Sequence, residues 1–68
     1  MLKDRVNVKI LIAERGMSLR DFSKKIEISQ GYLSQILNGD KTPSTKIAFK
    51  ISSGLEVEMK SIFFINVD

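Results

Sequence analysis

The sequence predicts an all-α fold, a single domain built from five short helices. Apolar residues recur at intervals of three and four, as in Leu19, Phe22 and Ile26, which is the spacing of one helix face. Capping and turn residues stand between these segments, and no segment shows the convincing apolar and polar alternation of a half-buried strand. The expected helices cover about residues 4–14, 19–26, 29–37, 44–53 and 58–65.

The boundaries of the first three helices follow from local signals. Gly16 is a natural residue to end the first helix, because glycine adopts the left-handed conformation at low cost. Ser18 is placed as the N-cap of the second helix, with Asp21 at the acidic position of a capping box. Ser29 takes the same capping role for the third helix, and Asn38-Gly39 ends that helix with turn chemistry.

The residues that predict the last two helices lie in the C-terminal part of the chain. Residues 40–44 predict a loop, after which Ile47, Ala48 and Ile51 lie on one stripe of the fourth helix. The fifth helix carries apolar residues at helical spacing, namely Met59, Ile62 and Phe63. We expect a core spanning about residues 6–63 and a C-terminal tail over 64–68.

Size and composition exclude several classes of protein. The chain has 68 residues, room for one domain, with no cysteine and no histidine. Disulfides, thiolate metal sites and the usual general base are therefore excluded, and neither a glycine-rich phosphate loop nor a carboxylate cluster is visible. An enzyme is not expected, nor is a cofactor. No apolar run approaches the length of about 20 residues that a membrane span needs, so we expect a soluble cytoplasmic protein.

The charge of the chain is unevenly distributed. The net charge is +3, but residues 1–50 hold ten Lys and Arg against five Asp and Glu. Residues 51–68 hold Lys60 against three acidic residues. A basic body with a mildly acidic end favours a polyanionic partner on one side.

Residues 18–39 contain two short helices joined by a three-residue turn, the arrangement of a helix-turn-helix. This stretch resembles the DNA-binding motif of the Cro and phage-repressor type, or XRE-type, family, and the resemblance extends over about residues 6–63. The matching features are small Ser23 where the two helices cross, Ser29-Gln30 at the start of the third helix, the closing Asn38-Gly39, and apolar Phe22, Ile26, Leu33 and Ile36.

The chain departs from the family pattern at three places. Glu27 and Glu56 stand where relatives often have glycine, and a positive φ there costs a non-glycine residue about 1 kcal/mol or more. The positions of a buried Arg and Glu pair in many relatives are occupied here by Ile12 and Leu37. Since both partners are apolar, we expect these two side chains to touch.

The resemblance implies that the third helix lies in the major groove of double-stranded DNA and reads bases with its first turns. Gln30 is the strongest candidate, because a glutamine can bond adenine at two atoms, although it can equally be an ordinary exposed side chain. Ser29 also serves as a cap, Gly31 is either kept small by the DNA or merely tolerated, and Tyr32 either contacts DNA or leans on the second helix. The candidate base-reading residues are Ser29, Gln30, Gly31, Tyr32, Ser34 and Gln35.

Phosphate contacts are expected from the residues around this helix. Side-chain cations and hydroxyls supply some of them, and free N–H groups at the starts of the second and fourth helices supply others. Lys24 and Lys25 are better explained as solvated charges. The candidate phosphate-binding residues are Leu19, Arg20, Asn38, Lys41, Thr42, Ser44 and Lys46.

The family resemblance also implies a homodimer on an inverted repeat. One candidate surface is the first helix, where either Val8, Leu11 and Ile12 or Val6, Ile10 and Ala13 face the core and leave the other set free. The preferred dimerisation surface lies at the C-terminus and comprises Met59, Phe63, Phe64 and Ile65.

Two functions remain open on this basis. The first is a sequence-specific transcriptional regulator, a repressor of phage or mobile-element kind, that covers its operator. The alternative is an antitoxin-like or adaptor module that binds a partner protein and regulates its own expression through DNA binding.

Overall fold

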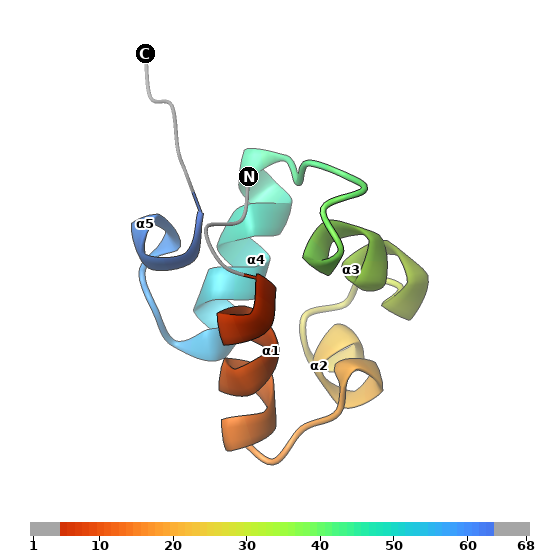
Figure 1. Ribbon diagram of the computed structural model, residues 1–68, viewed down its shortest axis with the longest axis vertical. Coiled ribbons are helices and arrows are strands. Elements are labelled where there is room, and N and C mark those ends of the chain that lie inside the picture. The colour runs from red at the N-terminus through yellow and green to blue at the C-terminus, as the bar shows by residue number, and fades with distance from the viewer. Residues whose placement is uncertain (1–4, 64–68) are drawn as a thin grey trace.

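The computed structural model describes residues 5–63, with side chains from residue 7 onwards. These residues form five α-helices, and the all-α prediction is confirmed (Figure 1). In this view α3 lies on the right and α5 on the left, with α1 and α4 between them. The helices are α1 (Arg5–Glu14), α2 (Leu19–Lys25), α3 (Gln30–Leu37), α4 (Thr45–Leu55) and α5 (Met59–Ile62).

Two of the expected boundaries were wrong. The fourth helix was expected to end at residue 53 but continues to Leu55, because Gly54 is accommodated inside it and Glu56 supplies a left-handed C-cap. The fifth helix was expected to reach residue 65 but ends at Ile62. Phe63 is extended, with φ −123° and ψ 147°, and its side chain is only 2% exposed. Burial of this ring in the core therefore replaces a further turn of helix.

The hydrophobic core draws on all five helices. Ile12 of α1 is 2% exposed and Leu37 of α3 is fully buried, and both belong to the same core cluster. This burial is consistent with an apolar replacement of a buried ion pair, and direct contact of the two side chains stays a prediction. The buried apolar residues are Val8, Ile12, Phe22, Ile26, Leu33, Ile36, Leu37, Ala48, Ile51, Leu55, Ile62 and Phe63.

Helix α1 turns one of its two apolar faces inward. Val8 and Ile12 are buried and Leu11 is half-buried against the core, so this set faces inward. Ile10 is 48% exposed and Ala13 is exposed as well. The second apolar face of α1 is thus left on the surface of the described chain.

Both glutamates at expected glycine positions have left-handed backbones. Glu27 has φ 60° in the turn between α2 and α3, and Glu56 has φ 59° after α4. Gly16 and Gly39 occupy the two corresponding positions after α1 and α3, with φ 70° and 84°. The turns therefore keep the shape that glycine would give them, at the strain cost that a side chain incurs there.

Gly54 allows α4 to approach α2 closely. A Cβ atom at this position would lie 2.6 Å from Cγ2 of Ile26 and 2.9 Å from Cε1 of Phe22. The Lys25 ammonium also donates a hydrogen bond of 3.2 Å to the Gly54 carbonyl oxygen. These contacts fix the C-terminal end of α4 against α2, the first helix of the helix pair α2 and α3.

Candidate nucleic-acid interface

The start of α2 is fixed by the capping box that the sequence predicts. The Asp21 amide donates to the Ser18 hydroxyl at 3.1 Å, and the Ser18 amide donates to Oδ2 of Asp21 at 3.2 Å. Hydrogen bonding of the Asp21 carboxyl to Ser18, first to its backbone amide and then to its side chain, holds the pKa of this carboxyl below its ordinary value, with smaller help from the charges of Lys24 and Arg20. The exposed N-terminus of α2 therefore has a defined orientation.

The turn after α2 sets the position of α3. Ser23 is 3% exposed, and its hydroxyl donates to the Arg20 carbonyl at 2.8 Å. Its own carbonyl accepts the Ile28 amide at 3.0 Å across the turn. A small buried residue at the crossing thus satisfies its polar groups and lets the two helices pack closely, as the sequence indicates.

Helix α3 separates a buried face from a polar exposed face. Ser29 is the N-cap, and its hydroxyl accepts the Tyr32 amide at 3.1 Å. The buried residues of the helix are Leu33, Ile36 and Leu37. Of the candidate base-reading residues, Ser29, Gln30, Gly31 and Gln35 are exposed, and Tyr32 and Ser34 are half-buried. The structure thus brings all six candidates together on or beside the first turns of one helix.

The structure bears on the alternatives left open for two of these residues. Tyr32 packs partly against the core cluster, so part of its side chain supports the domain. A Cβ atom added at Gly31 would meet no atom within 4 Å. No close contact among the described residues therefore requires glycine at this position.

The loop after α3 lies beside this helix and is ordered by it. The Gln35 carbonyl accepts the amides of Asp40 at 2.8 Å and Lys41 at 3.2 Å. The loop ends at Ser44, whose hydroxyl accepts the Ile47 amide at 3.2 Å and caps α4. Figure 1 shows α2, α3 and this loop along one side of the molecule.

Most of the expected phosphate-binding residues are accessible on this part of the chain. Leu19 is half-buried. Because its side chain is apolar, only its backbone amide can contact a phosphate. Lys25, expected to be a solvated charge, is exposed, and its ammonium also donates a hydrogen bond to the Gly54 carbonyl oxygen. The exposed candidates are Arg20, Asn38, Lys41, Thr42, Ser44 and Lys46.

The dimerisation residues expected at the C-terminus fall into three environments. Phe63 is a core residue and has almost no surface left for a partner. Met59 is half-buried at the start of α5, where it lines a hollow beside Phe49. Phe64 and Ile65 lie outside the described residues.

Sequence reasoning missed two residues that the tertiary structure makes prominent. Phe49 is 59% exposed on α4 although it is a large aromatic residue. Gly54 stands inside a helix, where glycine is unfavourable by about 1 kcal/mol, and that cost is a signal that could have indicated close packing.

A comparison with protein-family models agrees with this geometry. The helix-turn-helix family model matches residues 8–62, which is most of the chain. The chain belongs to the helix-turn-helix family. The expected resemblance to the Cro and phage-repressor type is thereby confirmed, and this helix-turn-helix protein is a DNA-binding transcription regulator. Neither the curated proteins nor the solved structures contain a match to the chain.

The described residues of this helix-turn-helix protein offer neither a metal site nor a membrane-spanning helix. Residues 5–63 contain no group of three or more acidic, cysteine or histidine side chains placed to hold a metal ion. Within the same range, no helix has both the length and the apolar character needed to cross a bilayer.

Proposed function

We propose that this protein is a repressor that binds an operator of two inverted half-sites as a homodimer, with α3 reading bases in the major groove. The observation that carries the proposal is the chemistry of α3. Its sequence, QGYLSQIL, has no charged residue, and its exposed first turn offers amide and hydroxyl groups. Such groups donate and accept hydrogen bonds at base edges, whereas a Lys and Glu surface would interact with phosphate regardless of sequence.

The residues around α3 support the same arrangement. Arg20 and Lys41 are exposed at the start of α2 and in the loop after α3. Ser44 is exposed at the N-terminus of α4, which is an eleven-residue helix. The first-turn amides that Ser44 does not cap suit a phosphate oxygen. Contacts to phosphate on both sides of α3 would hold its register along the groove.

The experiment that tests this proposal is selection of bound sites from random duplex DNA at physiological salt. We expect the selected sites to contain two inverted half-sites whose centres lie about one helical turn apart. Selected DNA without a common sequence, bound no better than random DNA, would contradict base reading by α3.

We place the dimer contact at the end of the chain, where Phe64 and Ile65 follow the core residue Phe63. The paired substitution Phe64→Ser and Ile65→Ser is expected to give a monomer in sedimentation experiments at high micromolar concentration. Ile10→Ser on α1 is the control, because Ile10 is 48% exposed on the competing surface. If Ile10→Ser abolishes the dimer and the paired substitution does not, the contact belongs to α1.

A further inference from the structure

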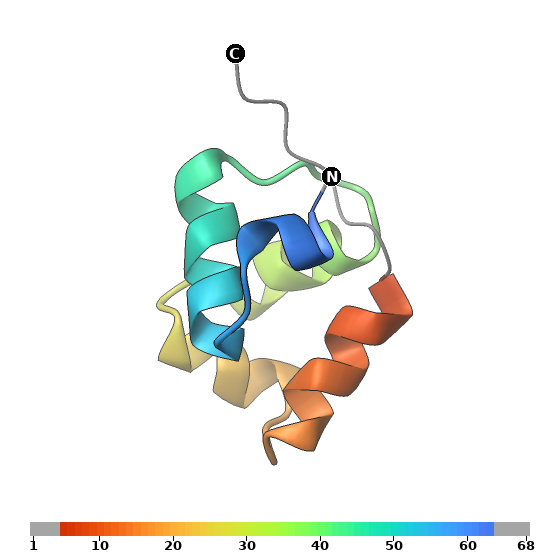
Figure 2. The ribbon, with the colours of Figure 1, turned by 90° about the vertical axis from the view of Figure 1, so that its left-hand side faces the viewer.

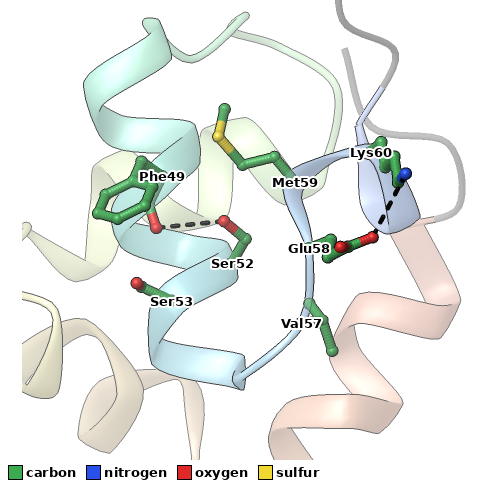
Figure 3. A pocket seen from close by; sticks show the side chains of 7 residues that line it. All are labelled: Phe49, Ser52, Ser53, Val57, Glu58, Met59 and Lys60. Atoms are coloured by element: carbon green, nitrogen blue, oxygen red, sulfur yellow. Dashed lines mark hydrogen bonds and ion pairs between the residues drawn. The ribbon is translucent and has the colours of Figure 1, made fainter.

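An exposed aromatic side chain marks a surface that DNA reading does not use. Phe49 of α4 is 59% exposed and borders a hollow of about 570 Å³ between α4 and α5. Val57 and Met59 provide the other apolar side chains of this hollow, as Figure 3 shows. Phe49 also lines a second, smaller hollow, and we call the two hollows together the Phe49 groove. Large exposed aromatic residues beside a concave surface are typical anchors of protein interfaces.

The larger hollow is suited to an apolar side chain. The Ser52 hydroxyl beneath it is already used, because it donates to the carbonyls of Ala48 at 3.0 Å and Phe49 at 3.2 Å. Glu58 and Lys60 at its edge form an ion pair of 3.6 Å with each other. Contact with Phe49, Val57 and Met59 is therefore the main interaction that this hollow offers a ligand.

The smaller hollow has an excess of positive charge. It measures about 380 Å³ and shares Phe49 and Ser53 with the larger hollow, and its charged residues are Lys25, Lys50 and Glu27. The Lys25 ammonium is held in place by its hydrogen bond to the Gly54 carbonyl. Two ammonium groups and one carboxylate beside an apolar hollow complement a segment that carries carboxylates next to a large apolar side chain.

The groove lies away from the DNA-reading face. Figures 1 and 2 show α3 and α5 on opposite sides of the molecule, and in Figure 2 α4 and α5 are nearer the viewer than α3. A symmetric pair of copies would place this same surface against itself. Lys25 and Lys50 of each copy would then face the same ammonium groups of the other, so the charge favours a different protein, with carboxylates, as the occupant.

We propose that the Phe49 groove is a docking site for an acidic segment of another protein. One large apolar side chain of the segment occupies the larger hollow, and its Asp or Glu residues lie beside Lys25 and Lys50. This inference goes beyond the proposed function, because the partner binds while α3 remains accessible to DNA.

The test is selection from a library of random peptides displayed against the full chain in the absence of DNA. We expect the selected peptides to share one large apolar residue flanked by Asp and Glu. Phe49→Ala and Lys50→Glu should each weaken binding of a selected peptide about tenfold or more. Ile10→Ala is the matched control, because Ile10 is the other large apolar residue exposed among those described, and it should leave binding unchanged.

Several outcomes would overturn the proposal. Selected peptides without acidic residues, or peptides that bind Phe49→Ala as tightly as the unsubstituted protein, would exclude the proposed segment. Self-association that depends on Phe49 would assign the groove to a second copy of the chain. Because peptide binding is measured without DNA, a failure of operator recognition leaves this result intact. Adding the selected peptide to the DNA complex should then leave DNA affinity unchanged, and competition would place the site on α3.

Discussion

At the scale of single residues, Gln30 combines the features that base reading requires. It is the first residue of α3, it is exposed, and the adjacent Ser29 fixes the start of its helix. The sequence indicated this position through the family pattern. Its exposure depended on which face of α3 packs inward, and the burial of Leu33, Ile36 and Leu37 decides that.

Replacing Gln30 with alanine should reduce discrimination between DNA sequences. We expect the binding free energy on the selected operator to fall by about 1–3 kcal/mol, with little change on random DNA, because the lost hydrogen bonds are specific to a base. Titration of both DNAs at one salt concentration measures the difference. Equal losses on the two DNAs would assign Gln30 to the DNA backbone.

Glu27 offers a prediction about stability. Its φ of 60° strains an L-residue by about 1–2 kcal/mol, whereas glycine adopts this conformation freely. Glycine is more flexible in the unfolded chain, and the entropy that it loses on folding offsets part of this gain. We therefore expect Glu27→Gly to stabilise the fold by about 0.5–1 kcal/mol. Urea unfolding checks this, with Lys24→Gly in α2 as the control that should be destabilising. Destabilisation of both variants would show that Glu27 is unstrained.

Asp21 links the capping box to pH. Because its pKa is lower in the folded protein, the carboxylate stabilises folding above its unfolded pKa of about 4. That contribution is lost as the pH falls through the lower pKa of the folded state. Asp21→Asn should therefore reduce the loss of stability on acidification below about pH 4, measured by thermal unfolding across this range. An unchanged pH profile would contradict a role for this carboxylate.

At the scale of elements, the packing of α4 on α2 depends on a glycine that the periodic pattern does not indicate. Ile47, Ala48 and Ile51 predicted one apolar stripe on α4, and Ala48 and Ile51 are buried, with Ile47 half-buried. The same pattern gave no reason to expect Gly54 against Phe22 and Ile26. Close approach of two helices depends on their relative placement, which local spacing does not encode.

The two helical glycines of this protein form a matched pair for testing that contact. Gly54→Ala should destabilise the fold by about 1–3 kcal/mol, because the added methyl group overlaps Ile26 and Phe22. Gly31→Ala should stabilise it by up to about 1 kcal/mol, since the position is open and alanine favours the helix. Chemical unfolding of both variants measures the contrast. Similar effects from the two substitutions would show that the contact at Gly54 is unimportant.

At the scale of the whole molecule, the basic body of the chain should make DNA binding depend strongly on salt. If about four to six phosphates are neutralised per subunit, the logarithm of affinity should fall with the logarithm of salt concentration at a slope of about −4 to −5 per subunit. Lys41→Ala should reduce the steepness by about 1, and Lys24→Ala, a solvated charge, should leave it unchanged. A salt titration on the selected operator measures the slope for the unsubstituted protein and for both variants. A Lys41→Ala slope equal to that of the unsubstituted protein would exclude Lys41 from phosphate contact.

The sequence by itself determined the helical class, the caps at Ser18 and Ser29, and the polar face of α3, because these follow from interactions within a few residues. Only the tertiary structure decided that Phe63 enters the core, that Phe49 remains outside it, and that Gly54 touches α2. An apolar residue can be buried in its own domain or exposed for a partner. The periodicity of the sequence predicts which face of a helix an apolar residue lies on. Its burial depends on which neighbouring helix covers that face.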